Sequence, residues 1–95
     1  MHIITRKRLN EFAERHPTAK PALAHWYHAL KPARPANFAE LRRLFPHADQ
    51  VGGLTVFNGG GYRCRLIAAI HYSRGKIYIR HVLTHPKYDK GKWKE

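Results

Sequence analysis

The first half of the chain carries apolar residues at helical spacing, in three stretches divided by prolines. In the first stretch, Leu9, Phe12 and Ala13 share one helix face, so we predict a helix that begins after Thr5 as its N-cap. Pro17 ends this helix, because the residue before a proline disfavours the α conformation.

The second stretch predicts a helix with Thr18 as its N-cap and Pro21 in its first turn. Its apolar residues fall at i, i+3, i+4 and i+7 and form a single face. These residues are Leu23, Trp26, Tyr27 and Leu30. Residues 31–35 contain two prolines and therefore form a linker.

The third stretch predicts a short helix that Asn37 opens and Pro46 closes, with Glu40 at the capping-box position. We expect its apolar residues to face inward. They are Phe38, Leu41 and Leu44.

The second half of the chain changes to the two-residue period of β-strands. The apolar run at 2–4 could add one strand at the N-terminus, and 54–57 forms another. Asn58 and Gly59 then make the dipeptide that is typical of a tight hairpin turn.

Two longer strands are predicted over 63–72 and 76–84, joined by a turn at 73–75. In the last strand we expect Ile77, Ile79 and Leu83 to pack on the helices, and Arg80 to lie on the opposite, open face. Helices followed by antiparallel strands predict an α+β fold of two layers.

The length of 95 residues predicts one domain, 1–95, and the 43% of hydrophobic residues is ordinary for a globular protein. Eighteen Lys and Arg against six Asp and Glu give a net charge of +12, spread over both halves of the chain. Such an excess favours a polyanionic partner, of which nucleic acid is the commonest; an acidic protein or an anionic membrane surface would also serve.

Cys64 is the only cysteine, which excludes an internal disulfide and fits a reducing compartment. No stretch approaches the roughly 20 apolar residues of a membrane span, and the N-terminal apolar run is too short for a signal peptide. We therefore expect a cytoplasmic protein that does not bind membranes.

The order and spacing of many residues resemble those of HigB toxins, members of the RelE-like superfamily, over essentially the whole chain. The most specific part is the stretch from Tyr78 to Asp89, which reads Tyr-Ile-Arg, then Thr-His, then Tyr-Asp. Earlier matching residues are Phe12, His16, Pro17, Trp26, Tyr27, Leu44, Phe45, Pro46, Ala48, Asp49, Phe57, Asn58, Gly60, Gly61, Arg65, Leu66 and Ile67.

This resemblance implies N-terminal helices packed on a small, curved antiparallel sheet, and an endoribonuclease that cleaves messenger RNA on the translating ribosome without a cofactor. It also implies a HigA-type antitoxin that neutralises the toxin and carries a helix-turn-helix domain. Operator DNA would be bound only through that antitoxin. The chain departs from the family pattern in its hairpin, at Gly59, Tyr62 and Cys64.

RNA can be cut by its own 2′-hydroxyl if a protein aligns that group, moves its proton, neutralises the phosphorane and protonates the leaving oxygen. We predict that Arg80 and Arg65 neutralise the phosphate, since Arg suits charge on phosphate oxygens. The alternative roles are a solvated strand Arg for Arg80 and a strand-edge charge for Arg65.

His85 is our candidate for proton transfer or contact with the scissile phosphate, or else a structural His bonded to backbone. Tyr88 could stack on a base, donate to the leaving group or pack the C-terminus on the sheet. Asp89 could act as a base, orient His85 or pair with a cation. The general base stays open among His85, Tyr88, Asp89 and Lys92.

Basic residues interleaved with aromatics near the C-terminus suit RNA through phosphate charge and base stacking. We expect RNA contacts from Asn58, Arg63, Lys87, Lys90, Lys92 and Trp93.

Other chemistries fit poorly. The pairs His25 with His28 and His81 with His85 lack the further Cys or carboxylate ligands of a zinc site. The glycines at 59–61 are not followed by the Lys and Ser/Thr of a phosphate-binding loop. Two alternatives to the nuclease remain, a non-catalytic module that binds RNA or ribosomes and a degenerate, weak toxin.

Overall fold

A five-stranded sheet with helices on both sides forms the molecule, according to a computed structural model that describes residues 1–59 and 64–94. The helices are α1 (Arg6–Arg15), α2 (Lys20–Leu30), α3 (Phe38–Leu44) and α4 (His85–Asp89). The strands are β1 (His2–Ile4), β2 (Asp49–Val51), β3 (Leu54–Gly59), β4 (Cys64–His71) and β5 (Lys76–Thr84). Short 3-10 turns are η1 (Pro17–Ala19), η2 (Tyr72–Arg74) and η3 (Lys92–Lys94).

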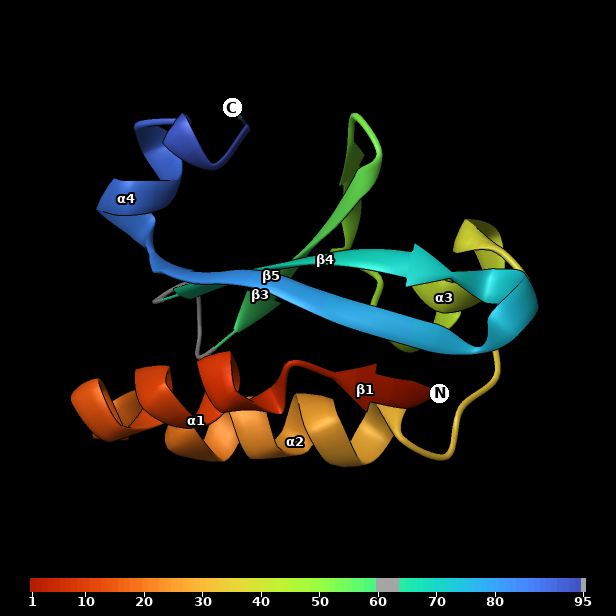
Figure 1. The fold of residues 1–95 in the computed structure, drawn as a ribbon, viewed down its shortest axis with the longest axis horizontal. Helices are drawn as coiled ribbons and strands as arrows, with labels where there is room; N and C mark the ends of the chain where they lie inside the picture. Colours follow the sequence, from red (N-terminus) through yellow and green to blue (C-terminus); the bar gives the residue numbers. More distant parts are fainter. Residues whose placement is uncertain (60–63, 95) are drawn as a thin grey trace.

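Figure 1 shows α1 and α2 beneath the sheet and α4 above it, near the end of β5. The strand order is β1-β5-β4-β3-β2. All neighbouring strands are antiparallel except β1, which pairs with β5 in parallel. The α+β fold class is therefore confirmed, whereas the sheet is mixed instead of wholly antiparallel. No helix in the described ranges is long and apolar enough to cross a membrane.

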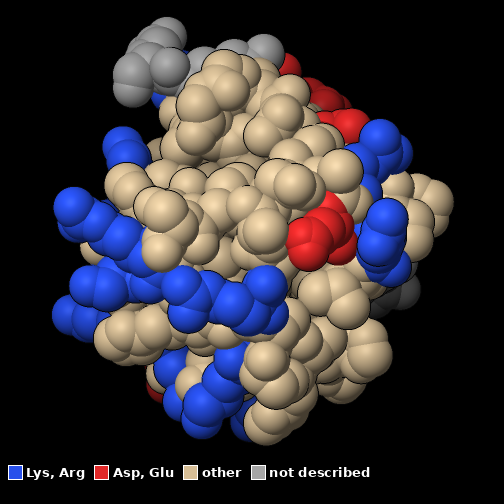
Figure 2. Space-filling model, turned by 90° about the vertical axis from the view of Figure 1, so that its right-hand side faces the viewer, with Lys and Arg blue, Asp and Glu red and all other residues tan. Residues whose placement is uncertain are grey.

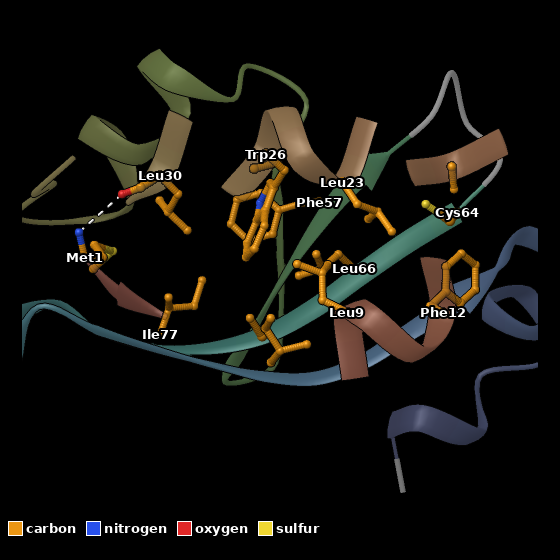
Figure 3. Close-up of a cluster of buried hydrophobic side chains, with 14 of the residues drawn as sticks. Met1, Leu9, Phe12, Leu23, Trp26, Leu30, Phe57, Cys64, Leu66 and Ile77 are labelled. Carbon is orange, nitrogen blue, oxygen red and sulfur yellow. Dashed lines mark hydrogen bonds between the residues drawn. The ribbon is translucent and has the colours of Figure 1, made fainter. Parts of the chain in front are cut away.

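The helix-facing core holds the apolar faces that the sequence predicts. Leu23, Trp26 and Leu30 of α2 are buried against Phe57 and Leu66 of the sheet (Figure 3). The rings of Trp26 and Phe57 meet edge to face with centroids 5.4 Å apart, a favourable aromatic geometry. This core fixes the sheet on α1 and α2, while the other face of the sheet carries polar residues beside a second, smaller apolar cluster.

The N-terminal end of the chain also ties the sheet to α2. The ammonium of Met1 donates to the carbonyl oxygens of Leu30, at 3.2 Å, and Lys31, at 2.8 Å. Figure 3 shows the first of these bonds. Carbonyls at a helix C-terminus lack partners within the helix, and a positive charge is favourable there.

Two predictions about the helices were wrong. Thr18 does not cap α2, because η1 continues directly into the helix and Ala19 takes the N-cap position. Leu44 does not face inward but is 48% exposed, since α3 ends at that residue. Thr5 is the N-cap residue of α1, as predicted, although its side chain accepts no capping hydrogen bond.

The capping of α3 was predicted correctly. Asn37 Oδ1 accepts a hydrogen bond of 3.0 Å from the Glu40 amide, and Leu41 is fully buried. Glu40 reaches back to the amide of Ala36, at 3.3 Å, one residue earlier than the usual capping-box partner.

Some strands begin or end at other residues than predicted, and the structure contains one strand that was not predicted. Asn58 and Gly59 form no turn: both lie in β3, where they pair with Arg65 and Cys64. The predicted strand β4 is confirmed over Cys64–His71, and β5 is confirmed over its full length. Strand β2 was missed, and it forms a hairpin with β3 around Gly52, whose φ is +61°.

A β-bulge in β5 changes which residues face the helices. Ile67 pairs with His81 and Ala68 pairs with Ile79, so Arg80 is an extra residue without an opposite partner. The alternation restarts after the bulge, and Val82 packs on the helix-facing core. The predicted inward position of Leu83 was therefore wrong: it packs in a second cluster with Val56, Ile67 and Trp93.

Candidate active site

The sheet face turned away from α1 and α2 carries the polar residues of β3, β4 and β5. Arg65 pairs with Leu83, and Asn58 stands opposite Arg65 on the next strand. Paired residues of neighbouring strands point to the same side of a sheet, so these three side chains share this face. His81 is a diagonal neighbour of Arg65 on the same face.

Arg65 is held by the aromatic residues of the C-terminal segment. Its guanidinium carbon lies 5.3 Å from the centroid of the Tyr88 ring, and the Tyr88 ring stacks on Trp93 at 5.2 Å. Trp93 Nε1 donates to the Tyr88 carbonyl oxygen at 3.0 Å. This stack docks α4 and η3 on the sheet and places a cation over an aromatic face, which is attractive.

One nitrogen of Arg65, Nη1, is enclosed and has no hydrogen-bond partner among the described residues. Buried donors are almost always paired, and an unpaired donor costs free energy. Arg65 also has no acidic partner among the described residues, so its positive charge is available to a phosphate.

A hollow of about 340 Å³ lies between α4, η3 and β5, and we call it the α4 hollow. It is lined by His81, Leu83, Lys87, Lys90, Lys92 and Trp93. The three lysines are exposed and form no salt bridge within the described ranges. None of the described lining residues is acidic, so the hollow is suited to a polyanion.

His85, the first residue of α4, contacts Asp89, the last residue of the same helix. His85 Nδ1 lies 3.1 Å from Asp89 Oδ2, one helical turn away, and both side chains are largely open to solvent. The carboxylate of Asp89 can accept a hydrogen bond from this nitrogen, which fixes the tautomer of the imidazole. Asp89 thus pairs with His85, as one of its predicted roles requires.

A second hollow of about 330 Å³ surrounds Arg80, and we call it the Arg80 hollow. Its lining includes Thr5 and Arg8 from the start of α1, together with His71 and Tyr78. Arg80 is exposed and is the extra, unpaired residue of the bulge, and its place on the open face stays a prediction. Along β5 it stands three residues before Leu83, the partner of Arg65, a separation of roughly 10 Å.

His81 lines the α4 hollow and follows Arg80 in β5, and sequence reasoning considered it only as half of a metal site. Burial lowers the pKa of His81 below its ordinary value, and the positive charges of Arg8 and Arg80 lower it further. The ring is therefore neutral at pH 7 and able to accept a proton. Only the register of the bulge, which the sequence does not reveal, brings His81 to this face.

The described residues contain no group of three or more His, Cys, Asp and Glu that could hold a metal ion. Cys64 is fully buried in the helix-facing core, and burial raises the pKa of its thiol, although Arg65 acts in the opposite direction. Cys64 therefore packs in the core, as predicted, and faces away from Arg65.

The structure thus brings Arg65 together with Tyr88, Trp93 and the lysines of the C-terminal segment. His85 and Asp89 lie on α4, the helix that carries Tyr88. Arg80 occupies the neighbouring hollow. Trp93 is 7% exposed, so most of its ring is covered by Tyr88 and the sheet. Asn58 is exposed, and Arg63 lies outside the described residues.

Lys and Arg are also numerous elsewhere on the surface. Figure 2 views the molecule from the side of the β4–β5 turn and shows a band of Lys and Arg across its lower left, with most acidic residues to the upper right. The positive potential therefore extends well beyond the two hollows.

Comparison with known proteins gives a consistent result. Residues 19–91 match the model of the HigB toxin family, described as the RelE-like toxic component of a toxin–antitoxin system. The chain is 35% identical over 92 residues to the mRNA interferase toxin HigB of Escherichia coli K12, which covers 94% of this chain and 88% of that protein. The mRNA interferase HigB of Shigella flexneri matches with the same identity and coverage. The mRNA interferase HigB of Escherichia coli O6:H1 is 30% identical over 93 residues, 95% of this chain and 90% of that protein.

Proposed function

The chain belongs to the HigB toxin family, and on this premise we propose that it is an endoribonuclease that cleaves messenger RNA. The observation that carries the proposal is Arg65, whose guanidinium lies over Tyr88 and has no acidic partner among the described residues. Beside it is the α4 hollow, in which exposed lysines are available for the RNA backbone. The names of the relatives, which refer to mRNA cleavage, support the same activity.

In the proposed reaction the 2′-hydroxyl attacks the adjacent phosphorus, and the bond from phosphorus to the 5′-oxygen breaks. The products are a 2′,3′-cyclic phosphate and a 5′-hydroxyl. Arg65 neutralises the charge that builds on the phosphate oxygens, and Arg80 adds a second positive charge from the neighbouring hollow. Lys87, Lys90 and Lys92 hold the backbone on the other side.

Two histidines are suited to move the protons. His81 accepts the proton of the 2′-hydroxyl, because its lowered pKa keeps it neutral. His85 donates a proton to the leaving oxygen, and Asp89, whose Oδ2 lies 3.1 Å from His85 Nδ1, orients the imidazole ring. Tyr88 positions Arg65 and is the alternative proton donor, while Asn58 contacts the RNA at the edge of the site. Trp93 is mostly covered and offers the RNA only the part of its ring that lines the α4 hollow.

The finer parts of the proposal follow from family membership. The toxin acts in the cytoplasm on mRNA in the translating ribosome, and a HigA-type antitoxin neutralises it. Operator DNA is contacted only through that antitoxin, and the reaction needs no cofactor.

The degenerate-toxin alternative depends on Gly59, Tyr62 and Cys64. The side chain of Cys64 points into the helix-facing core and not toward the site, so it cannot weaken cleavage by contact with RNA. Its replacement by Tyr would overpack that core. Tyr62 lies outside the described residues.

Production of the toxin in cells without an antitoxin tests the proposal. New 5′ ends are mapped by primer extension on an abundant mRNA, for the wild type and for the Arg80→Ala, His85→Ala double variant. We expect cuts in translated regions with the wild type only. Arg43→Ala, which removes an exposed charge on the distant α3, is the control that keeps full cleavage.

Wild-type protein that is folded and associates with ribosomes, yet yields no new 5′ ends, would identify a non-catalytic binding module. Full cleavage by the double variant would contradict the site.

A further inference from the structure

The Arg80 hollow combines features that the proposed cleavage chemistry does not require. Two arginines from distant parts of the chain meet there, Arg8 in the first turns of α1 and Arg80 on β5. Neither guanidinium has an ion pair or hydrogen bond with a described residue, and none of the described lining residues is acidic. Like charges placed together without a counter-ion cost free energy, which an anionic ligand would recover.

The backbone at this hollow is irregular on both sides. Thr5 has a φ of +68° and is the only non-glycine residue in the described ranges with a positive φ. This conformation is unfavourable for a β-branched residue. Across the hollow, the β-bulge adds Arg80 to β5 and directs its side chain. Strained residues and bulges are concentrated at functional sites.

The hollow also contains an aromatic surface. The rings of His71 and Tyr78 meet edge to face, with centroids 5.2 Å apart and an interplanar angle of 80°. His71 is exposed and Tyr78 is partly exposed. Aromatic faces beside cations are the combination that binds a nucleotide, because the base stacks on a ring and the phosphate pairs with the cations.

We propose that the Arg80 hollow is a second RNA subsite, in which Arg8 binds the phosphodiester that flanks the cleaved one and the His71–Tyr78 ring pair contacts its base, while Arg80 keeps its role beside the cleaved phosphate. The ligand is single-stranded RNA, and this identification rests on the proposed function. His81 lines the α4 hollow and directly follows Arg80, which lines the Arg80 hollow, so the two hollows are neighbours along β5. An RNA strand in the α4 hollow can thus continue across β5 toward α1.

The experiment measures the affinity of the whole protein for a mixed-sequence oligoribonucleotide that carries 2′-O-methyl groups throughout. This probe cannot be cleaved by its own 2′-hydroxyl, so binding is measured without chemistry. The dissociation constant is determined by fluorescence anisotropy at several salt concentrations for the wild type, Arg8→Ala, His71→Ala and the control Arg43→Ala. Circular dichroism verifies that each variant is folded.

We expect Arg8→Ala to weaken binding several-fold and to reduce the slope of log K against log salt by about 0.7, the value for one phosphate contact on a single strand. His71→Ala should weaken binding about fivefold, because it removes a ring on which the base stacks. Arg43→Ala should behave like the wild type.

Equal affinity and equal slope for Arg8→Ala and Arg43→Ala would overturn the subsite, while mRNA cleavage by the wild type would still stand. Conversely, a wild-type protein that binds RNA through Arg8 but cleaves no mRNA would contradict the proposed nuclease activity and leave the subsite supported.

Discussion

At the scale of single residues, the site depends on a few side chains whose surroundings decide their chemistry. Arg65 and Cys64 are neighbours in β4, yet one lies over Tyr88 on the open face and the other is fully buried in the core. Strand alternation separates them, and this separation was predictable. The neutral His81 and the strained Thr5 were not predictable, because both depend on partners distant in sequence.

Thr5 gives a prediction about stability. We expect Thr5→Gly to raise the free energy of unfolding by up to about 1 kcal/mol, because relief of a positive φ outweighs the greater freedom of glycine in the unfolded chain. Thr18→Gly is the control: Thr18 lies exposed in the regular turn η1, and its replacement should cost about 0.5–1 kcal/mol. Urea unfolding measures both, and an equal loss in the two variants would show that Thr5 is not strained.

His81 gives a prediction about pH. Its pKa is about 6.5 in the unfolded chain and lower in the folded protein, so the unfolded state binds more protons below that pH. The free energy of unfolding should therefore fall as pH drops from about 6.5 toward the lowered pKa, with no contribution above 6.5. Arg8 and Arg80 face the ring from one side and Lys87, Lys90 and Lys92 line the hollow on the other.

His81→Gln should lack this part of the pH dependence. Urea unfolding of both proteins at pH 8.0, 6.5 and 5.5 isolates the effect, because the other histidines cancel in the difference. Parallel curves for wild type and variant would rule out the lowered pKa.

At the scale of elements, local patterns predicted the helices and the long hairpin, since their apolar period and caps lie within each segment. Strand β2 was missed because Asp49, Gln50 and Val51 show no apolar alternation and depend on β3 for pairing. The bulge at Arg80 was missed because no residue type marks it. His85, Tyr88 and the lysines were predictable as a group, since one short segment carries them all, whereas Arg8 reaches its hollow only through the fold.

The bulge predicts an asymmetry between two single-residue deletions in β5. Deletion of Arg80 should leave a folded protein, because Ile79 and Val82 then alternate regularly and both keep facing the helices. Deletion of Tyr78, in the regular part of the strand, should unfold the protein, because it turns either Ile77 or Ile79 out of the core. The melting temperatures of the two deletion variants are compared by circular dichroism. Equal melting temperatures would contradict the bulge at Arg80.

At the scale of the whole molecule, a net charge of +12 on 95 residues governs both stability and binding. Self-repulsion destabilises the compact state, and salt screens it. The described residues include few acidic side chains to offset this charge, and the two described salt bridges are largely solvent-exposed. The same excess of charge draws the protein to RNA.

Salt should therefore have opposite effects on the two properties. An increase from about 0.02 to 0.2 M NaCl should raise the melting temperature of the free protein and weaken RNA binding by one or more orders of magnitude. Calorimetry and anisotropy measure the two trends in the same buffers. A melting temperature that falls with salt would mean that attractive surface pairs outweigh the repulsion.

The most direct test of the account is the chemistry of the cut ends. Purified protein is mixed with ribosomes translating a defined mRNA, and the fragments are analysed for the groups at each new terminus, for the wild type and for Arg65→Ala. We predict a 2′,3′-cyclic phosphate on the upstream fragment and a 5′-hydroxyl on the downstream one, and no cut with the folded variant. A 3′-hydroxyl with a 5′-phosphate, or undiminished cutting by Arg65→Ala, would contradict attack by the 2′-hydroxyl at this site.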